Sequence, residues 1–161
     1  MDVLTKSTNI EGVIRQPLRQ ITEQRGAVLH MLKNDSPLFM GFGEIYFSEI
    51  KGGVVKAWRR HLKMTQHIAV PVGAIRLVIY DDRTGSRTKG QLAEILTGRA
   101  GDYCLVRIPP MLWYGFQGMN KSTSLIANCT DIPHDPEEIE RLDENTNRIP
   151  YKWPTDISLG Q

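Results

Sequence analysis

The stretch GVVKAWRRHLKMTQHIAVPVG, residues 53–73, decides the fold. Glycines stand at both ends, and four valines, one isoleucine and one tryptophan lie between them among basic residues. β-Branched and aromatic residues favour strands, whereas glycine and proline mark the turns between strands. We therefore predict two consecutive strands here, over residues 54–62 and 67–72.

The same pattern of short apolar segments and turn residues continues on both sides of this stretch. One helix is expected near the C-terminus, because Asp135 is a suitable N-cap, Pro136 suits the first turn, and acidic residues follow on the way to Leu142. Many short strands and one short C-terminal helix predict an all-β fold, a jelly-roll β-barrel. Further strands are predicted over residues 13–17, 27–32, 39–48, 74–80, 103–108, 113–117 and 124–129.

Residues 90–98, GQLAEILTG, are ambiguous. Leu92, Ile95 and Leu96 have helical spacing, so the local periodicity favours a helix. The family resemblance described below favours a strand, and a strand is our prediction.

The length and composition indicate one domain, residues 1–161, with residues 1–10 as a polar N-terminal arm and residues 155–161 as a C-terminal tail. A formal net charge of +2 is too small to indicate nucleic acid as a partner. Signal-peptide features and a bilayer-spanning apolar run are both missing from the sequence, so we expect a cytoplasmic protein with no membrane partner. Cys104 and Cys129 lie in apolar runs and are expected to be buried free thiols.

Three basic side chains within residues 53–73 are the first indication of chemistry. Arg59, His61 and Lys63 alternate along the predicted strand, so they share one face. A basic row inside a cavity suits an anion or an oxygen-rich ligand, whereas on an outer face it would simply be solvated. The glycine-framed spacing favours the cavity.

No metal and no other cofactor are expected. A stable transition-metal site needs three or four nitrogen, oxygen or sulfur ligands, and only His61 and Tyr114 qualify here. Acid–base chemistry is the better use, because the positive charge of Arg59 favours the neutral, basic form of His61. Tyr114, placed across the cavity, would donate a proton or hydrogen-bond a carbonyl oxygen. Both His61 and Tyr114 also have a purely structural interpretation, as packing and hydrogen-bonding residues.

The spacing of residues 53–73 and 108–116 resembles that of the two cupin signature motifs. The metal-ligand positions of that pattern are occupied here by Arg59, His61, Gln66 and Tyr114. Almost the whole chain resembles the dTDP-4-dehydrorhamnose 3,5-epimerase family, a cupin-fold group of sugar-nucleotide enzymes. The resemblance is carried by EQRG at 23–26, GVVKAW at 53–58, VIYDDR at 78–83, IPPMLWYGF at 108–116, CTD at 129–131 and WP at 153–154.

This resemblance implies a nucleotide-diphosphate sugar as the ligand and a set of residues that bind it. Arg25 and Lys56 would bind the diphosphate, and Arg59 would stabilise enolate or phosphate charge. Gln66 and His67 would also belong to the substrate-binding set. The resemblance also implies a homodimer with shared N-terminal strands, in which Arg25 comes from the neighbouring subunit.

The chain departs from the family pattern where the chemistry takes place. The family's catalytic histidine falls on Arg59, its active-site lysine falls near His67, and its tyrosine acid has no counterpart around residues 132–134. A related group, the dTDP-sugar 3,4-ketoisomerases, is similar to this chain at His61, at Gln66 and over residues 109–113. His61 is therefore the residue of the cluster that can still act as the base.

We predict an isomerase that inverts C3, C5 or both in a nucleotide-linked 4-keto-6-deoxyhexose, in surface polysaccharide or deoxysugar biosynthesis. His61 would remove a proton acidified by the 4-keto group, and Tyr114 or water would return one to the other face. Two alternatives stay open. One is a 3,4-ketoisomerase on the same substrate class, and the other is a cupin that binds the sugar nucleotide without catalysis.

Overall fold

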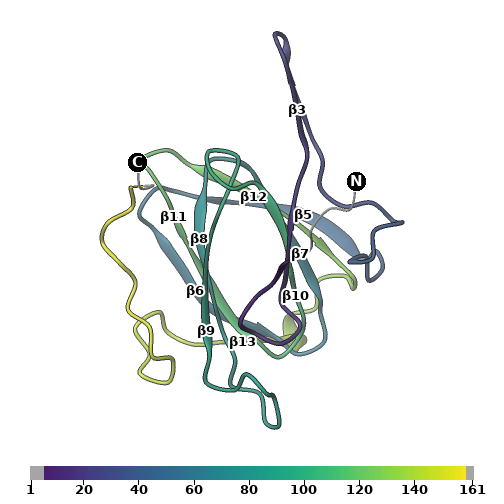
Figure 1. Cartoon of the computed structure of the whole chain (residues 1–161). Helices are drawn as coiled ribbons and strands as arrows, with labels where there is room; N and C mark the ends of the chain where they lie inside the picture. The colour runs from purple at the N-terminus through teal and green to yellow at the C-terminus, as the bar shows by residue number, and fades with distance from the viewer. Residues whose placement is uncertain (1–5, 159–161) are drawn as a thin grey trace.

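The computed structural model describes residues 6–158, which form two antiparallel β-sheets packed face to face (Figure 1). The strand order is β1-β2-β10-β7-β12-β5 in the six-stranded sheet and β13-β6-β11-β8-β9 in the five-stranded sheet. The six-stranded sheet comprises β1 (Lys6–Ser7), β2 (Ile14–Pro17), β5 (Glu44–Ile50), β7 (Gln66–Val72), β10 (Cys104–Ile108) and β12 (Ser124–Thr130). The five-stranded sheet comprises β6 (Val55–His61), β8 (Ile75–Tyr80), β9 (Leu92–Thr97), β11 (Trp113–Gly118) and β13 (Ile139–Arg141).

The main core lies between the sheets and takes side chains from both. Ile68 and Val70 on β7 face Leu77 and Ile79 on β8, and all four side chains are buried. Because successive residues of a strand point to opposite faces, His67 and Ala69, which alternate with these residues on β7, point outward. There they are covered by a second apolar cluster that includes Leu38.

The all-β prediction is confirmed, since each predicted strand overlaps an observed one. Residues 90–98 contain strand β9, so tertiary pairing with β8 decides against the helical spacing of the apolar residues. Three short strands, β1, β3 and β13, were not predicted from the sequence.

The prediction of a C-terminal helix is wrong. Asp135 caps a turn as expected, because its side chain accepts a hydrogen bond from the backbone N–H of Glu137 at 3.0 Å. The turn is a single 3₁₀ turn, η1 (Pro136–Glu138), and the chain continues as strand β13. Pairing of β13 with β6 supplies backbone hydrogen bonds that a short isolated helix would have to provide alone.

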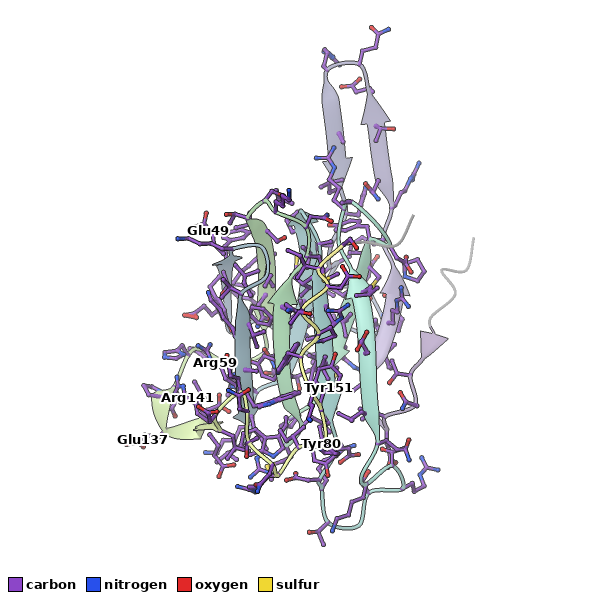
Figure 2. The ribbon with its side chains drawn as sticks, turned by 90° about the vertical axis from the view of Figure 1, so that its left-hand side faces the viewer. Glu49, Arg59, Tyr80, Glu137, Arg141 and Tyr151 are labelled. Carbon is purple, nitrogen blue, oxygen red and sulfur yellow. The ribbon has the colours of Figure 1, made fainter. Side chains whose placement is uncertain are left out.

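A two-stranded hairpin, β3 (Gln20–Glu23) and β4 (Gly26–Leu29), projects away from the two sheets (Figures 1 and 2). Within the expected N-terminal arm, Lys6–Ser7 pair with β2, and Ile10 is buried in the main core. Residues 1–5 of that arm and 159–161 of the expected tail lie outside the described residues. Within residues 6–158, no helix has the length and apolar character needed to cross a membrane.

Candidate active site

Three side chains from three parts of the chain meet at one end of the five-stranded sheet. His61 is the last residue of β6, Tyr114 lies on the neighbouring strand β11, and Glu138 ends the turn that precedes β13. Strand β13 pairs with β6, with Ile139 opposite His61, and this pairing brings Glu138 against the histidine. Glu138 was not among the site residues expected from the sequence.

The three side chains form a continuous hydrogen-bonded line. The Nδ1 atom of His61 lies 2.5 Å from Oε1 of Glu138, and its Nε2 atom lies 3.1 Å from the hydroxyl of Tyr114. The rings of His61 and Tyr114 are nearly parallel, with centroids 5.8 Å apart. His61 is 4% exposed and Glu138 2% exposed, so water has little access to the pair.

The protonation state of Glu138 sets the tautomer of His61. Burial alone would raise the pKa of Glu138, but hydrogen bonds from the His61 ring and from the backbone amides of Lys63 and Met64 outweigh it and lower that pKa. An ionised carboxylate only accepts hydrogen bonds, so Nδ1 of His61 carries the proton. Nε2 is then the basic nitrogen, and it accepts the hydrogen bond of Tyr114.

Tyr114 keeps its proton at neutral pH. Burial raises its pKa strongly, the nearby Tyr46 adds to the rise, and the positive charge of Arg59 opposes it. We expected Tyr114 to lie across a cavity from His61, but its hydroxyl is in direct contact with the imidazole. The reason is the register, since β6 and β11 are neighbours in one sheet and place Tyr114 opposite Arg59 on the same face.

An irregularity in β6 changes which basic side chains face the site. In the pairing with β11, Arg59 is opposite Tyr114 and Lys56 is opposite Phe116, so β6 carries one extra residue in this interval. The bulge places Lys56 on the same face as Arg59, where strict alternation would have placed it on the other. The Nζ atom of Lys56 donates to the carbonyl oxygen of Glu49 on β5, at 2.6 Å, and thus spans the two sheets.

The expected row of Arg59, His61 and Lys63 is shorter than predicted. Strand β6 ends at His61, and Lys63 contributes its backbone amide to Glu138 while its side chain is exposed. Arg59 is also exposed, and Arg141 of β13 is its cross-strand partner on the same side of the molecule (Figure 2). The exposed positive charge near the three buried side chains therefore comes from Arg59, Arg141 and Lys56.

The six-stranded sheet contributes a polar group of its own. Asn128 on β12 donates from Nδ2 to the hydroxyl of Tyr46 on β5, at 2.9 Å, and to Oε1 of Gln66 on β7, at 3.0 Å. Gln66 was expected in the site, whereas Tyr46 and Asn128 were not. No sequence signal separates Tyr46 from the other aromatic residues, because its importance comes from neighbours on other strands.

Two expected substrate-binding residues lie elsewhere in the described subunit. His67 points to the outer face of the six-stranded sheet, is fully buried, and has its ring nitrogens 2.9 Å from the carbonyl oxygen of Cys129 and 2.8 Å from that of Leu38. One nitrogen thus contacts the neighbouring strand β12, and the other contacts the segment that covers this face. Arg25 lies at the tip of the projecting hairpin, with 86% of its side chain exposed and an ion pair to Glu23.

Across residues 6–158, no group of three or more His, Cys, Asp and Glu side chains is arranged to hold a metal ion. The groups that do converge are a carboxylate, an imidazole, phenols, amides and arginines. Such a set is suited to proton transfer and to binding an anionic ligand.

Comparison with known proteins places this site in a family. The chain is 34% identical over 145 residues to the probable low-salt glycan biosynthesis epimerase Agl13 of Haloferax volcanii, covering 89% of each protein. It is 26% identical over 150 residues to the spore coat polysaccharide biosynthesis protein SpsL of Bacillus subtilis, covering 92% of this chain and 99% of the relative. No family model matches the chain.

The solved structures that resemble this chain are also sugar isomerases and epimerases. A dTDP sugar isomerase from Desulfovibrio desulfuricans G20 superposes with a TM-score of 0.88 at 50% identity, over 94% of both chains. NovW, a 4-keto-6-deoxy sugar epimerase from Streptomyces spheroides, has a TM-score of 0.84 at 20% identity, over 99% of this chain and 83% of its own, and shows the shared fold. The chain belongs to the family of sugar epimerases and isomerases related to dTDP-4-dehydrorhamnose 3,5-epimerase, and it is an enzyme of that type.

Proposed function

We propose that this enzyme moves a proton at a carbon next to the ketone of a nucleotide-linked 4-keto-6-deoxyhexose, and so inverts C3, C5 or both. The observation that carries the proposal is the buried line from Glu138 through His61 to Tyr114, which is an arrangement for general-base catalysis. The named relatives act in glycan and spore coat polysaccharide biosynthesis, which supports a role in surface polysaccharide or deoxysugar biosynthesis.

The geometry supports a relay in which Tyr114 receives the proton from the sugar. Both ring nitrogens of His61 are already engaged, one with Glu138 and the other with Tyr114. When the C–H bond breaks, its electron pair moves to the 4-keto oxygen, and the proton passes to the oxygen of Tyr114. Tyr114 passes its own proton to Nε2 of His61, and the resulting imidazolium is paired with the Glu138 carboxylate.

Basic residues at the edge of β6 would bind the diphosphate and stabilise the enolate. Lys56 and Arg59 are exposed and lie on the face that carries Tyr114 and His61. Arginine and lysine both bind phosphate oxygens, and a fixed positive charge near a developing oxyanion lowers the barrier to proton abstraction. The amide of Gln66 would contact the sugar from the six-stranded sheet.

We further propose a homodimer in which the β3–β4 hairpin of one subunit reaches the site of the other. Its projection from the body and the exposure of Arg25 support this assignment (Figure 1). The two facing sheets and the TM-score of 0.81 to a dTDP-4-dehydrorhamnose 3,5-epimerase from Elizabethkingia anophelis support the assignment of the fold as a cupin-type jelly roll.

The test is hydrogen exchange with solvent. The enzyme is incubated in D₂O with several nucleotide-linked 4-keto-6-deoxy sugars, and mass spectrometry and proton NMR report deuterium at C3 and C5. The proposal expects uptake at one or both carbons together with an inverted product. A His61→Ala variant should lose the uptake and keep its affinity for the nucleotide diphosphate.

A 3,4-ketoisomerase is the second candidate, favoured by the 50% identity to a dTDP sugar isomerase. It would exchange hydrogen at C3 and yield a 3-keto sugar, with C5 unchanged. Wild-type protein that binds these sugars but incorporates no deuterium from any of them, even at high protein concentration, would reject both reactions and favour a binding protein.

A further inference from the structure

Tyr46 belongs to the six-stranded sheet, which packs against the sheet that carries His61 and Tyr114. On β5 it is directly opposite Asn128 of β12, so the two side chains share a face. Ile50 and Ile126, which alternate with them on the same faces of the two strands, lie in the core between the sheets. The phenol of Tyr46 therefore points inward, and the contact from Lys56 to the backbone of β5 holds the two sheets together beside it.

The orientation of Asn128 leaves the proton of Tyr46 available. The Oδ1 atom of Asn128 accepts a hydrogen bond from the backbone N–H of His67, at 3.3 Å, so Nδ2 is the end that faces Tyr46 and Gln66. An amide NH₂ only donates, so the hydroxyl oxygen of Tyr46 is the acceptor. Its own O–H is free to donate to something else in the site.

Tyr46 is also in the form that can donate. Burial raises its pKa, while the hydrogen bond from Asn128 and the charge of Arg59 act in the opposite direction without cancelling the rise. Glu44 and Glu138 add to the rise through their negative charge. The phenol is therefore neutral at physiological pH.

Inversion of a carbon requires groups on both of its faces, whereas a ketoisomerase can work from one face. Tyr114 and His61 are hydrogen-bonded to each other on the five-stranded sheet, so they serve one face only. A sugar held between the sheets would have its other face toward Tyr46. A sugar bound there would thus have a proton-transfer group on each of its faces.

We propose that Tyr46 is the catalytic acid that returns a proton to the sugar face opposite Tyr114, which makes the enzyme an epimerase. This assignment rests on the proposed function above. The enolate electron pair forms the new C–H bond with the proton of Tyr46, the ketone is restored, and Tyr46 is left as a phenolate. Asn128 donates a hydrogen bond to that phenolate, which regains its proton from solvent while the His61 imidazolium releases one.

The deciding experiment separates exchange from inversion in a Tyr46→Phe variant. The variant and wild type are compared in D₂O with the 4-keto sugar that wild type accepts. We expect the inverted product to form about 10²- to 10³-fold more slowly in the variant. The starting sugar should still gain deuterium with its configuration unchanged, because Tyr114 and His61 can remove and return hydrogen on their own face.

Tyr103→Phe is the matched control, since Tyr103 donates to the carbonyl oxygen of His30 on the outer side of the six-stranded sheet. It should invert at the wild-type rate. A second variant, Asn128→Asp, replaces the hydrogen-bond donor beside Tyr46 with an acceptor. The carboxylate would accept a hydrogen bond from the Tyr46 hydroxyl, which would then be less available to the sugar. This variant should also slow inversion more than exchange.

Three results would count against the assignment. Inversion at the wild-type rate in folded Tyr46→Phe would overturn it, and so would an equal loss of exchange and inversion, because neither fits a donor to one face. Production of a 3-keto sugar by wild type would identify a one-faced ketoisomerase. Absence of all exchange in wild type would instead reject the proposed function itself, and the assignment of Tyr46 with it.

Discussion

The carboxylate of Glu138 lies 2.5 Å from Nδ1 of His61, although the two residues are 77 positions apart in the sequence. The contact is made possible by β13, which pairs with the edge of β6 and places the preceding residue beside the histidine. It fixes the proton on Nδ1 and leaves Nε2 basic.

Replacing Glu138 with glutamine should impair catalysis while keeping the fold. Glutamine retains an oxygen that can accept from the backbone amides of Lys63 and Met64, but its NH₂ group would favour the wrong tautomer of His61. We expect deuterium uptake to fall about 10²- to 10⁴-fold, the usual range for loss of a positioned acid or base. The rate is measured in D₂O, with Glu137→Gln, an exposed neighbour, as the control. Unchanged uptake in Glu138→Gln would show that the pair has no catalytic role.

Removing the hydroxyl of Tyr114 distinguishes a relay from direct abstraction by His61. If the sugar proton passes through Tyr114, the Tyr114→Phe variant should lose exchange by about 10²-fold or more. If His61 removes the proton itself, the same change frees Nε2 from its hydrogen bond and exchange should persist or accelerate. Binding of the nucleotide diphosphate, measured by calorimetry, should be the same in variant and wild type.

Acid should destabilise the protein through Glu138. The pKa of this carboxylate in the folded state is below its ordinary value of 4.5, so its contribution to the free energy of unfolding is fully present above pH 4.5. The contribution is lost as the pH falls through the lower folded-state pKa. Denaturant unfolding between pH 6 and 3 should therefore show a steeper loss in wild type than in Glu138→Gln. Parallel curves for the two proteins would contradict this account.

Subunit complementation tests the proposed role of Arg25 across a dimer. Arg25→Ala and His61→Ala variants should each be weakly active or inactive when alone. Mixed by unfolding and refolding together, they would form heterodimers in which one site combines an intact His61 with the intact Arg25 of the other subunit. Random pairing then predicts recovery of about a quarter of wild-type activity. A mixture that stays as inactive as its components would place Arg25 in its own subunit's site or outside the reaction.

Part of the site could be predicted from short-range sequence patterns. His61 and Tyr114 lie in two segments whose spacing resembles a known motif pair, and the strands that carry them were predicted close to their observed limits. Glu138 was missed because its local sequence favours a helix N-terminus. Instead, the residues after Glu138 pair with the free edge of β6 and form a strand. This pairing joins segments 77 positions apart, so the local sequence around Glu138 does not reveal it.

The directions in which the basic side chains of β6 point could also be predicted only in part from the sequence. Alternation predicts the direction of a side chain only in a regular strand, and the bulge between Lys56 and Arg59 reverses it. The prediction that Arg59 and His61 share a face is confirmed at the level of strand register, because the bulge lies before both. Lys56 joins them only in the folded sheet.

The sequence by itself determined the all-β class, most of the strands and the histidine on which the proposed reaction depends. Those features follow from residue type and spacing within single segments. Only the tertiary structure decided which carboxylate supports His61, that Tyr114 lies beside it, and that Tyr46 points inward from the other sheet. The physical reason is that hydrogen bonds between strands, and the register they impose, bring together side chains whose positions in the sequence carry no mark of their contact.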